Sequence, residues 1–403
     1  MSTSLLYHGF SIRGYDYVRT AYQDGQVIFT VRQEPRKFRC QACGSRLVHP
    51  RGQVERQFRS LPIGGRATII VFPIPRVACQ ACGVVRQVEI DFADPRRTYT
   101  RAFERYALEL LRHMTILDVA RHLDVSWDII KDIQKRDLTR RYAKPKLKNL
   151  SQIAIDEIAI AKGHRYVTVV LNLESGAVVF VGDGKGANAL NPFWKRLRGS
   201  KAKIKAVAMD MSPAYREAVS THLPSATIVY DRFHVTKLFN DKLSHLRRSL
   251  YNRAAHEQKK VLKGVRWLLL KLSENLEAER DEKARLKQAL KLNKPLALAY
   301  YMKEDLRQLW EQPGKKYATF FLNDWIRRAK ASGVQMLRQM AKTLDAHRSG
   351  LLAYYDYPIS TGPLEGTNNK IKTMKRQAYG FRDHEFFKLK ILAIHRTKYA
   401  LVG

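Results

Sequence analysis

The hydrophobic and polar positions from Ser151 to Tyr230 alternate in short runs that are typical of β-strands. Apolar runs bounded by turn residues predict five strands, at 153–160, 165–173, 177–181, 204–210 and 227–230. Two helices are expected between the later strands, one over 187–197 and one from Pro213, which suits a first helical position after Ser212. The first three strands form a predicted meander with Glu174-Ser-Gly176 as one of its turns. This segment therefore predicts an α/β core.

Helical periodicity precedes this core. An amphipathic helix is expected over 101–114, and Thr115 and Ser126 are suitable caps for two further helices, the last over 127–138. A helix, a short turn and a helix with these apolar offsets form the helix-turn-helix pattern, although a plain three-helix packing unit would look similar. The basic, proline-containing stretch 140–148 is a plausible domain boundary.

A second helical region, 237–347, lies beyond the last strand. It is rich in Leu, Ala and Tyr and heavily basic, and it is far longer than the preceding α/β core requires. We therefore predict an inserted helical domain. Its Trp267, Trp310 and Trp325 stand at helical spacing among leucines, which favours core packing.

The charge of the chain narrows its class of partner. The chain of 403 residues contains 73 Lys and Arg but only 37 Asp and Glu, so its formal net charge is +36. The excess of positive charge is spread over most of the chain. Such a field attracts phosphate backbones but does not by itself distinguish DNA from RNA. The first residues do not resemble a secretion signal and no apolar run approaches about 18 residues, so we expect an intracellular chain with no membrane partner.

All four cysteines fall in two near-identical pentapeptides, Cys40-Gln-Ala-Cys-Gly44 and Cys79-Gln-Ala-Cys-Gly83. Each pair suits a tight turn that presents two thiolates, and the 35 residues between the pairs contain turn and strand signals. Cys40, Cys43, Cys79 and Cys82 therefore predict a zinc ribbon with one structural Zn²⁺ and an enlarged loop, the alternative being four unliganded or redox thiols. Basic residues around the cysteines, including Arg36, Lys37 and Arg46, suggest a DNA-contacting face.

Three acidic residues are candidates for a second metal site. Asp156 and Asp210 follow apolar runs and are expected at strand ends, while Glu365 begins a basic, helix-like stretch. The strand and helix order is that of the RNase-H-like fold, in which the first and fourth strands lie side by side. Carboxylates are natural ligands of Mg²⁺, and two such ions can act together on a phosphodiester. A single Asp at a strand end is, however, most often a simple turn former.

At these residues the chain resembles DDE insertion-sequence transposases of the ISL-three group, over nearly its whole length. The motifs that carry the resemblance are Ile155-Asp-Glu157, Asp210-Met-Ser-Pro-Ala-Tyr215, Asp231-Arg-Phe-His234, and 362–372 followed by 375–382. Thr361 stands where the group often has Asn. The resemblance implies that Asp156, Asp210 and Glu365 are the catalytic triad, with two Mg²⁺ or Mn²⁺ ions.

Further residues receive roles from this resemblance and from helical spacing. His234 would contact the scissile phosphate or a water at the metal, oriented by Asp231; alternatively the pair only braces the start of the insertion. Asn368 and Asn369 share the helix face of Glu365 and could bind phosphate or hold a carboxylate. Predicted DNA contacts, for which a merely solvated face is the alternative, are Lys131, Lys135, Arg136, Lys370, Lys372, Lys375, Arg376 and Arg382. An insertion-domain Trp that stacks on a flipped base is the alternative to core packing.

The sequence thus predicts a multidomain α+β protein with an interrupted RNase-H-like core. The expected parts are a zinc ribbon (1–95), a helix-turn-helix with basic linker (96–148), the first part of the core (149–236), a helical insertion (237–347) and the C-terminal part of the core (348–403). The expected function is a cytoplasmic, nucleoid-associated transposase that cuts inverted-repeat ends and joins their 3′-OH groups to target DNA. We expect a homodimer or larger synaptic assembly. The alternatives are a catalytically silent DNA-binding regulator and an RNase-H-like nuclease.

Overall fold

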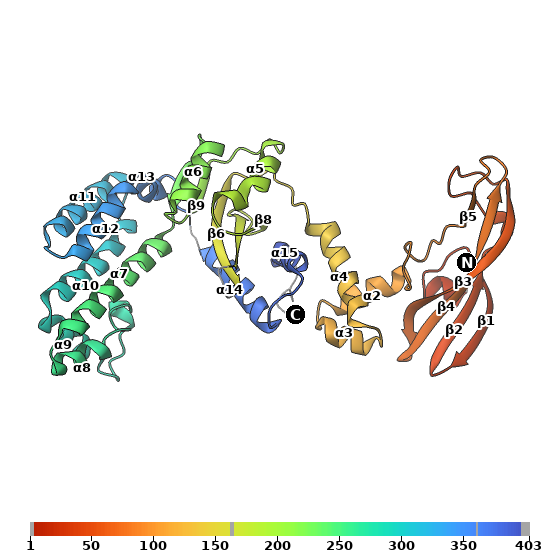
Figure 1. Ribbon diagram of the computed structural model, residues 1–403, viewed down its shortest axis with the longest axis horizontal. Coiled ribbons are helices and arrows are strands. Elements are labelled where there is room, and N and C mark those ends of the chain that lie inside the picture. Colours follow the sequence, from red (N-terminus) through yellow and green to blue (C-terminus); the bar gives the residue numbers. More distant parts are fainter. Residues whose placement is uncertain (1–3, 162–164, 360–361, 396–403) are drawn as a thin grey trace. The chain divides into compact units, whose positions relative to one another are not determined.

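The computed structural model describes residues 4–161, 165–359 and 362–395 (Figure 1). The chain divides into two compact units, one of Met1–Ala143 with Asp383–Gly403 and one of Lys144–Arg382. In the described part of the chain, every helix is too short or too polar to cross a membrane.

The first unit begins with a five-stranded sheet in the order β1-β2-β4-β3, with β5 paired to β4. Its strands are β1 (Asp16–Gln23), β2 (Gln26–Arg32), β3 (Val48–Ile63), β4 (Arg66–Cys79) and β5 (Val85–Gln87), and the short helices α1 (Leu5–His8) and η1 (Pro35–Lys37) accompany them. Strands β3 and β4 form a hairpin where the sequence shows turn and strand signals between the cysteine pairs, and its turn has positive φ at Gly64 and Gly65. Phe58, Phe72 and Phe92 pack edge to face in its core, so the sheet has an apolar centre of its own.

Three helices follow, α2 (Arg101–Leu110), α3 (Ile116–His122) and α4 (Trp127–Tyr142). Thr115 and Ser126 cap α3 and α4 as predicted, each accepting a backbone hydrogen bond from the third residue beyond it. Helix α2 ends four residues earlier than predicted, and α4 runs one turn further. Helix α15 (His384–Ala393) packs against α4, so the segment predicted as the C-terminal part of the core is divided between the two units.

The second unit contains the predicted α/β sheet, in the order β10-β9-β6-β7-β8. The strands are β6 (Gln152–Ala161), β7 (Arg165–Asn172), β8 (Val178–Asp183), β9 (Ala206–Met209) and β10 (Thr227–Tyr230); the accompanying helices are η2 (Ala187–Leu190), α5 (Asn191–Arg198) and α6 (Pro213–His222). The first three strands are an antiparallel meander, while β9 runs parallel to β6 and β10 parallel to β9. The first and fourth strands therefore lie side by side, as the RNase-H-like order predicts.

The remaining elements of this unit are helical. They are α7 (Arg232–Arg253), α8 (His256–Gly264), η3 (Ser273–Asn275), α9 (Glu282–Leu292), α10 (Lys294–Leu306), η4 (Arg307–Trp310), α11 (Lys315–Ala331), α12 (Gln335–Ala346), α13 (Arg348–Leu352), η5 (Ala353–Tyr355) and α14 (Gly362–Gln377). Helix α7 starts directly after β10, so the predicted insertion boundary at 237 lies inside this helix. A Cβ on Gly350 would lie 2.4 Å from the Tyr230 ring, so only glycine lets α13 approach β10 this closely.

The three tryptophans of the insertion have different environments. Trp310 and Trp325 are buried, as their helical spacing predicts. The core-packing prediction is wrong for Trp267, whose residue surface is 64% exposed. Its neighbours Leu268 and Leu269 fill the interior instead, and the Trp267 ring stacks with the guanidinium of Arg266 at 4.6 Å.

Candidate active site and zinc centre

Strand register brings Asp156 and Asp210 to the same level of the sheet. The last parallel pair between β6 and β9 is Ala154 with Ala208, and each aspartate follows two residues later. Asp210 comes directly after β9, as predicted, but Asp156 lies in the middle of β6 and does not end it. The reason is that β6 continues beyond β9 by pairing with β7, where Asp156 faces Val169.

Hydrogen bonds hold the Asp156 carboxylate from two sides. Its Oδ1 accepts from the Glu157 backbone N–H at 2.8 Å, and its Oδ2 accepts from Nδ2 of Asn368 at 2.5 Å. Asn368 lies on α14, one turn beyond Glu365. Asp210 accepts from the Ser212 backbone N–H at 3.0 Å. The Asn368 amide thus links the helix that carries Glu365 to the strand that carries Asp156.

The buried Asp231 and the half-buried His234 form a pair at the start of α7. Asp231 caps this helix through the Phe233 N–H at 2.8 Å, and its second oxygen lies 2.9 Å from Nδ1 of His234. Nε2 of His234 lies 3.9 Å from Oδ1 of Asp156. Burial alone would lower the pKa of His234, but the bond to Asp231 and the charges of Asp156, Asp231 and Asp210 outweigh burial and raise it. The imidazole is therefore oriented by Asp231 and turned toward the carboxylates.

The electrostatics of Asp156 favour a nearby cation. Burial, the largest effect, and the charge of Asp210 raise the pKa of Asp156. The Glu157 amide, His234 and Asn368 oppose this shift and do not cancel it. A carboxylate in these surroundings is costly to ionise without an added positive charge.

A cavity of about 200 Å³ opens beside these groups. Its lining includes Asp156, Asp231, His234, Glu365 and Asn368. The structure thus brings two of the three predicted triad residues to one cavity, while Asp210 interacts electrostatically with Asp156 beside it. Within the described residues, ligand atoms of three or more Asp, Glu, His or Cys side chains lie within 4.8 Å of one another only at the four cysteines. The three carboxylates consequently do not close around a single point.

The donors of this cavity fit a hard divalent cation. They are carboxylate oxygens together with Oδ1 of Asn368, which is buried and has no hydrogen-bond partner. An unsatisfied buried oxygen costs free energy, and Mg²⁺ prefers oxygen ligands. The residues present therefore suit the magnesium or manganese predicted from the sequence.

The four cysteines form a compact group at one end of the β3–β4 hairpin. Sγ of Cys40 lies 3.6 Å from Sγ of Cys82, and the same distance separates Cys43 and Cys79. The register of the hairpin pairs Val48 with Cys79, which brings the two turns together despite their separation in sequence. Four mutually close thiols fit tetrahedral zinc with no open position, so this is the predicted structural zinc centre.

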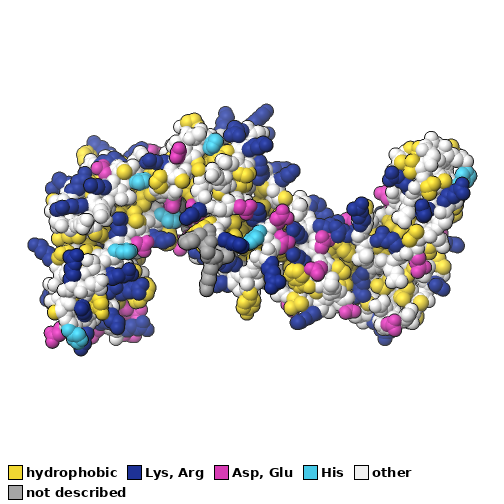
Figure 2. Space-filling view, viewed as in Figure 1, with side chains coloured by type: hydrophobic (Ala, Val, Ile, Leu, Met, Phe, Trp, Pro, Cys, Tyr) yellow, Lys and Arg dark blue, Asp and Glu magenta, His cyan; other side chains and the backbone are white. Residues whose placement is uncertain are grey.

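Several predicted DNA contacts are engaged in ion pairs within the protein. In the ribbon, Arg36, Lys37 and Arg46 are all exposed, and Arg36 and Lys37 both contact Glu34. On α4, Lys131 and Lys135 contact Asp383, and Arg136 contacts Asp94 and Glu104. Among the contacts predicted on α14 or just beyond it, the exposed residues are Asn369, Lys370, Lys372, Arg376 and Arg382, while Asn368 and Lys375 are half-buried. Lys and Arg side chains cover much of the visible surface of both units (Figure 2).

Sequence reasoning missed some residues of the cavity. Phe233 and Lys237 line it from α7, and Leu364 lines it from α14. The signal for Lys237 was available, because it follows His234 by three residues on a helix capped by Asp231 and so shares its face. Thr361, noted for its departure from the motif, lies outside the described residues.

Comparisons with known proteins match three successive parts of the chain. A family model described as a transposase matches residues 153–391. A model for the helix-turn-helix domain of transposase family ISL3 matches residues 88–137. A model for the zinc-finger of transposase IS204/IS1001/IS1096/IS1165 matches residues 36–82.

Curated relatives cover most of the chain. The transposase for insertion sequence element IS1001 of Bordetella parapertussis is 33% identical over 358 residues, which is 88% of each chain. The transposase for insertion sequence element IS1557 of Mycobacterium tuberculosis is 29% identical over 372 residues, 85% of this chain and 82% of the relative. A chain of the Drosophila P element transposase strand transfer complex is 13% identical, covers 66% of this chain and 81% of that chain, and has a TM-score of 0.34, too low to support an inference.

Proposed function

The chain belongs to the ISL3 family of transposases, and from this premise we propose that it cuts the ends of its mobile element and joins them to target DNA by metal-assisted phosphoryl transfer. The observation that carries this proposal is the cavity that Asp156, His234, Glu365 and Asn368 line together. These groups come from β6, α7 and α14, and Asp210, directly after β9, lies at the same level of the sheet as Asp156.

Asp156, Asp210 and Glu365 would hold two Mg²⁺ or Mn²⁺ ions. When bound, such ions supply positive charge to the attacking and leaving oxygens of an in-line displacement. Asn368 holds the Asp156 carboxylate in place through its Nδ2. A catalytic group fixed in this way needs no rearrangement when the substrate arrives.

His234 and Asp231 are proposed to act on the phosphate. Asp231 fixes the imidazole through Nδ1, which leaves Nε2 toward the cavity. Since the pKa of His234 is raised, its charged form can donate from Nε2 to a non-bridging oxygen of the scissile phosphate. Lys237 and Lys372, which line the same cavity, would contact the adjoining backbone, and Lys370, Lys375, Arg376 and Arg382 would extend this grip.

The first 150 residues are proposed to bind the inverted repeats, with the zinc ribbon and the helix-turn-helix as the two modules. Base edges would be contacted from the helix-turn-helix, and phosphates from basic residues of the ribbon such as Arg46. Two ends must be held together before they are joined, so we propose that the active form is a dimer or a larger assembly on DNA.

A catalytically silent regulator is the second candidate, and the cavity argues against it. A DNA-binding regulator has no use for a largely buried carboxylate such as Asp156, whose pKa is raised by burial and by the charge of Asp210, because such a group costs stability. An RNase-H-like nuclease would keep the carboxylates but would show no preference for element ends.

The test is cleavage of a labelled element end in Mg²⁺ or Mn²⁺ by the wild type and by Asp156→Ala and Glu365→Ala. Both variants should lose cleavage and retain end binding, because the ligands of the ions and the DNA-binding modules are separate parts of the chain. Glu217→Ala, which removes an exposed carboxylate on α6, is the matched control and should cut normally. Normal cleavage by both test variants would show that the catalytic assignment is wrong.

A further inference from the structure

The basic face of α4 that a helix-turn-helix would present to DNA is covered by helix α15. Asp383 lies 3.2 Å from Lys131 and 3.0 Å from Lys135, and Glu385 lies 3.4 Å from Lys135. Phe386 packs beneath the Lys131 ammonium at 6.0 Å. Both lysines are therefore neutralised by carboxylates of the same unit.

The part of the α4 surface next to α15 offers little to a phosphate backbone. Ile130 and Ile133 are buried on the side of α2 and α3. The strip between this side and α15 carries the exposed Asp128 and also Asp132, which pairs with Arg97 at 2.8 Å. Carboxylates repel phosphates, so the side of α4 that lies toward α15 is poorly suited to phosphate contacts.

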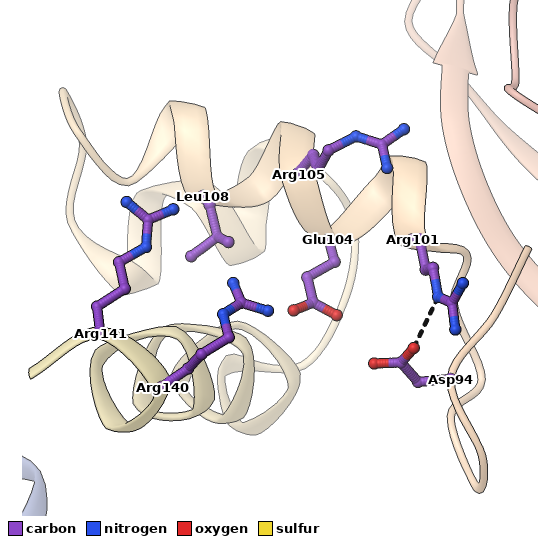
Figure 3. A pocket seen from close by; sticks show the side chains of 7 residues that line it. All are labelled: Asp94, Arg101, Glu104, Arg105, Leu108, Arg140 and Arg141. Carbon is purple, nitrogen blue, oxygen red and sulfur yellow. Dashed lines mark hydrogen bonds and ion pairs between the residues drawn. The ribbon is translucent and has the colours of Figure 1, made fainter. Parts of the chain in front are cut away.

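Basic residues also line a pocket of about 320 Å³ between α2 and α4. Four arginines line it: Arg101 and Arg105 from α2, and Arg140 and Arg141 from α4. Figure 3 shows Arg140 and Arg141 reaching from α4 toward α2, with Leu108 between the helices. The Arg140 and Arg141 side chains are 65% and 57% exposed, so their guanidinium groups are open to a ligand.

Positive charge exceeds negative charge in this network. Together with Arg136, five arginines share only the three carboxylates of Asp94, Glu104 and Asp137. The ion pairs are Arg101–Asp94 at 2.7 Å, Arg136–Asp94 at 2.6 Å, Arg136–Glu104 at 3.3 Å, Arg140–Asp137 at 2.5 Å and Arg141–Asp137 at 2.9 Å. Arg105 is exposed and makes no ion pair with the described residues. Two positive charges are therefore left over beside a pocket of suitable size.

We propose that this pocket binds the phosphodiester backbone of the element end through Arg105, Arg140 and Arg141. Guanidinium groups match phosphate oxygens with paired hydrogen bonds, and a phosphate would supply the negative charge that the network lacks. The assignment rests on the proposed function, since it assumes that this unit binds element ends. It places the phosphate contacts of the helix-turn-helix on the side of α4 opposite to α15.

The test is the salt dependence of binding to a labelled end duplex and to a scrambled duplex of equal length. Each phosphate contact adds about 0.9 to the slope of log affinity against log salt, which is roughly a fivefold effect on affinity at 0.15 M. The variant R105Q/R141Q should lower the slope by nearly 2 and weaken both duplexes by the same factor, because phosphates carry no sequence information. R136Q is avoided because Arg136 joins α4 to α2 and to Asp94.

The matched control is K131Q/K135Q, which removes the same charge from the other face of α4. It should leave the slope unchanged, with equal melting temperatures confirming that both variants fold. An unchanged slope in R105Q/R141Q with a reduced slope in K131Q/K135Q would overturn the proposal and assign the DNA to the α15 face. Tighter binding of single-stranded RNA than of either duplex would also overturn it. If the wild type binds both duplexes equally, end recognition fails, yet the slopes still decide whether the pocket holds backbone phosphate.

Discussion

The two candidate metal centres of this transposase differ in how far they are assembled without metal. At the zinc ribbon, four sulfur ligand atoms from Cys40, Cys43, Cys79 and Cys82 lie within 4.8 Å of one another. At the acidic cavity, Asp156 and Glu365 share a lining and Asp210 is adjacent, but no such cluster of carboxylates forms within the described residues. The zinc centre therefore has its ligand atoms already in place, which we call closed, whereas the carboxylates of the acidic cavity lie apart, which we call open.

Acid–base chemistry explains this difference better than distance along the chain. Hydrogen bonds from the Cys43 and Ala42 backbone amides lower the pKa of Cys40 to about 6. At Cys82 the Val84 amide acts to lower the pKa, but bonds with Cys43 and Cys40 prevail and raise it to about 12. A neutral thiol can thus donate to a neighbouring thiolate, whereas two ionised carboxylates have no proton to share and repel one another, and the charge of Asp210 contributes to the raised pKa of Asp156. Four thiols can therefore lie close together without a metal ion, whereas three carboxylates come together only around a bound cation.

The largest expected effect is a difference in metal retention. Structural Zn²⁺ sites hold their ion by about 10–16 kcal/mol, so zinc should survive dialysis against metal-free buffer, while an open carboxylate site should lose Mg²⁺ completely. Elemental analysis after dialysis should give one zinc per chain and no magnesium. Cys79→Ser should release the zinc without unfolding the sheet around Phe58 and Phe72. If magnesium stays bound without DNA, or zinc is lost, the contrast between the two centres is false.

The zinc centre could be predicted almost completely from the sequence. The repeated pentapeptides identify the ligands, and Gly44 and Gly83 reach positive φ after each second cysteine. The five core strands and their order along the chain also followed from the hydrophobic pattern, whereas the pairing of the first with the fourth strand came from the likeness of this order to the RNase-H-like fold. These features depend on local sequence, which is why they were predictable.

Other features depend on long-range packing and were not predictable. The place of Asp156 inside β6 depends on the extra length of β7, and the contact between α4 and α15 joins residues about 250 positions apart. The exposure of Trp267 was missed because hydrophobic periodicity does not show which residues of this segment face the core. The assignment of Asp156, Asp210 and Glu365 to one reaction came from the resemblance, and it stays a prediction.

A smaller effect is expected from Asn368, which holds Asp156 toward the cavity. Loss of a group that orients a metal ligand reduces activity about 10–100-fold, so Asn368→Ala should cut more slowly and need more Mg²⁺ for half-maximal rate. Cleavage rate against Mg²⁺ concentration is the measurement. A shifted Mg²⁺ requirement distinguishes positioning from a general loss of folding. Gln377→Ala, an exposed change at the end of the same helix, is the control and should match the wild type; an unshifted Mg²⁺ requirement in Asn368→Ala would count against the role.

The smallest effect concerns the ion pairs between Asp383 of α15 and the lysines of α4. It tests whether attraction between opposite charges holds these two distant segments together. Burial alone would raise the pKa of Asp383, but bonds from the Phe386 backbone amide, Lys135 and Lys131 lower it from 3.8 to about 2. A carboxyl whose pKa is depressed on folding stabilises the fold above its unfolded pKa, so the contribution is full above pH 4 and is lost as the pH falls toward 2. For a partly exposed cluster we expect at most about 1 kcal/mol.

Hydrogen-exchange protection of the α15 amides at pH 5 and pH 2.5 is the measurement. Wild-type protection should fall at the lower pH beyond the fall in Asp383→Asn, which keeps the helix cap and removes only the charge. Glu385→Gln, at a side chain that is 80% exposed, should behave almost like the wild type. If Asp383→Asn keeps the same pH dependence as the wild type, the α15 contact is held by apolar packing alone. Charge would then not explain why α4 and α15 are in contact while the carboxylates of the acidic cavity stay apart.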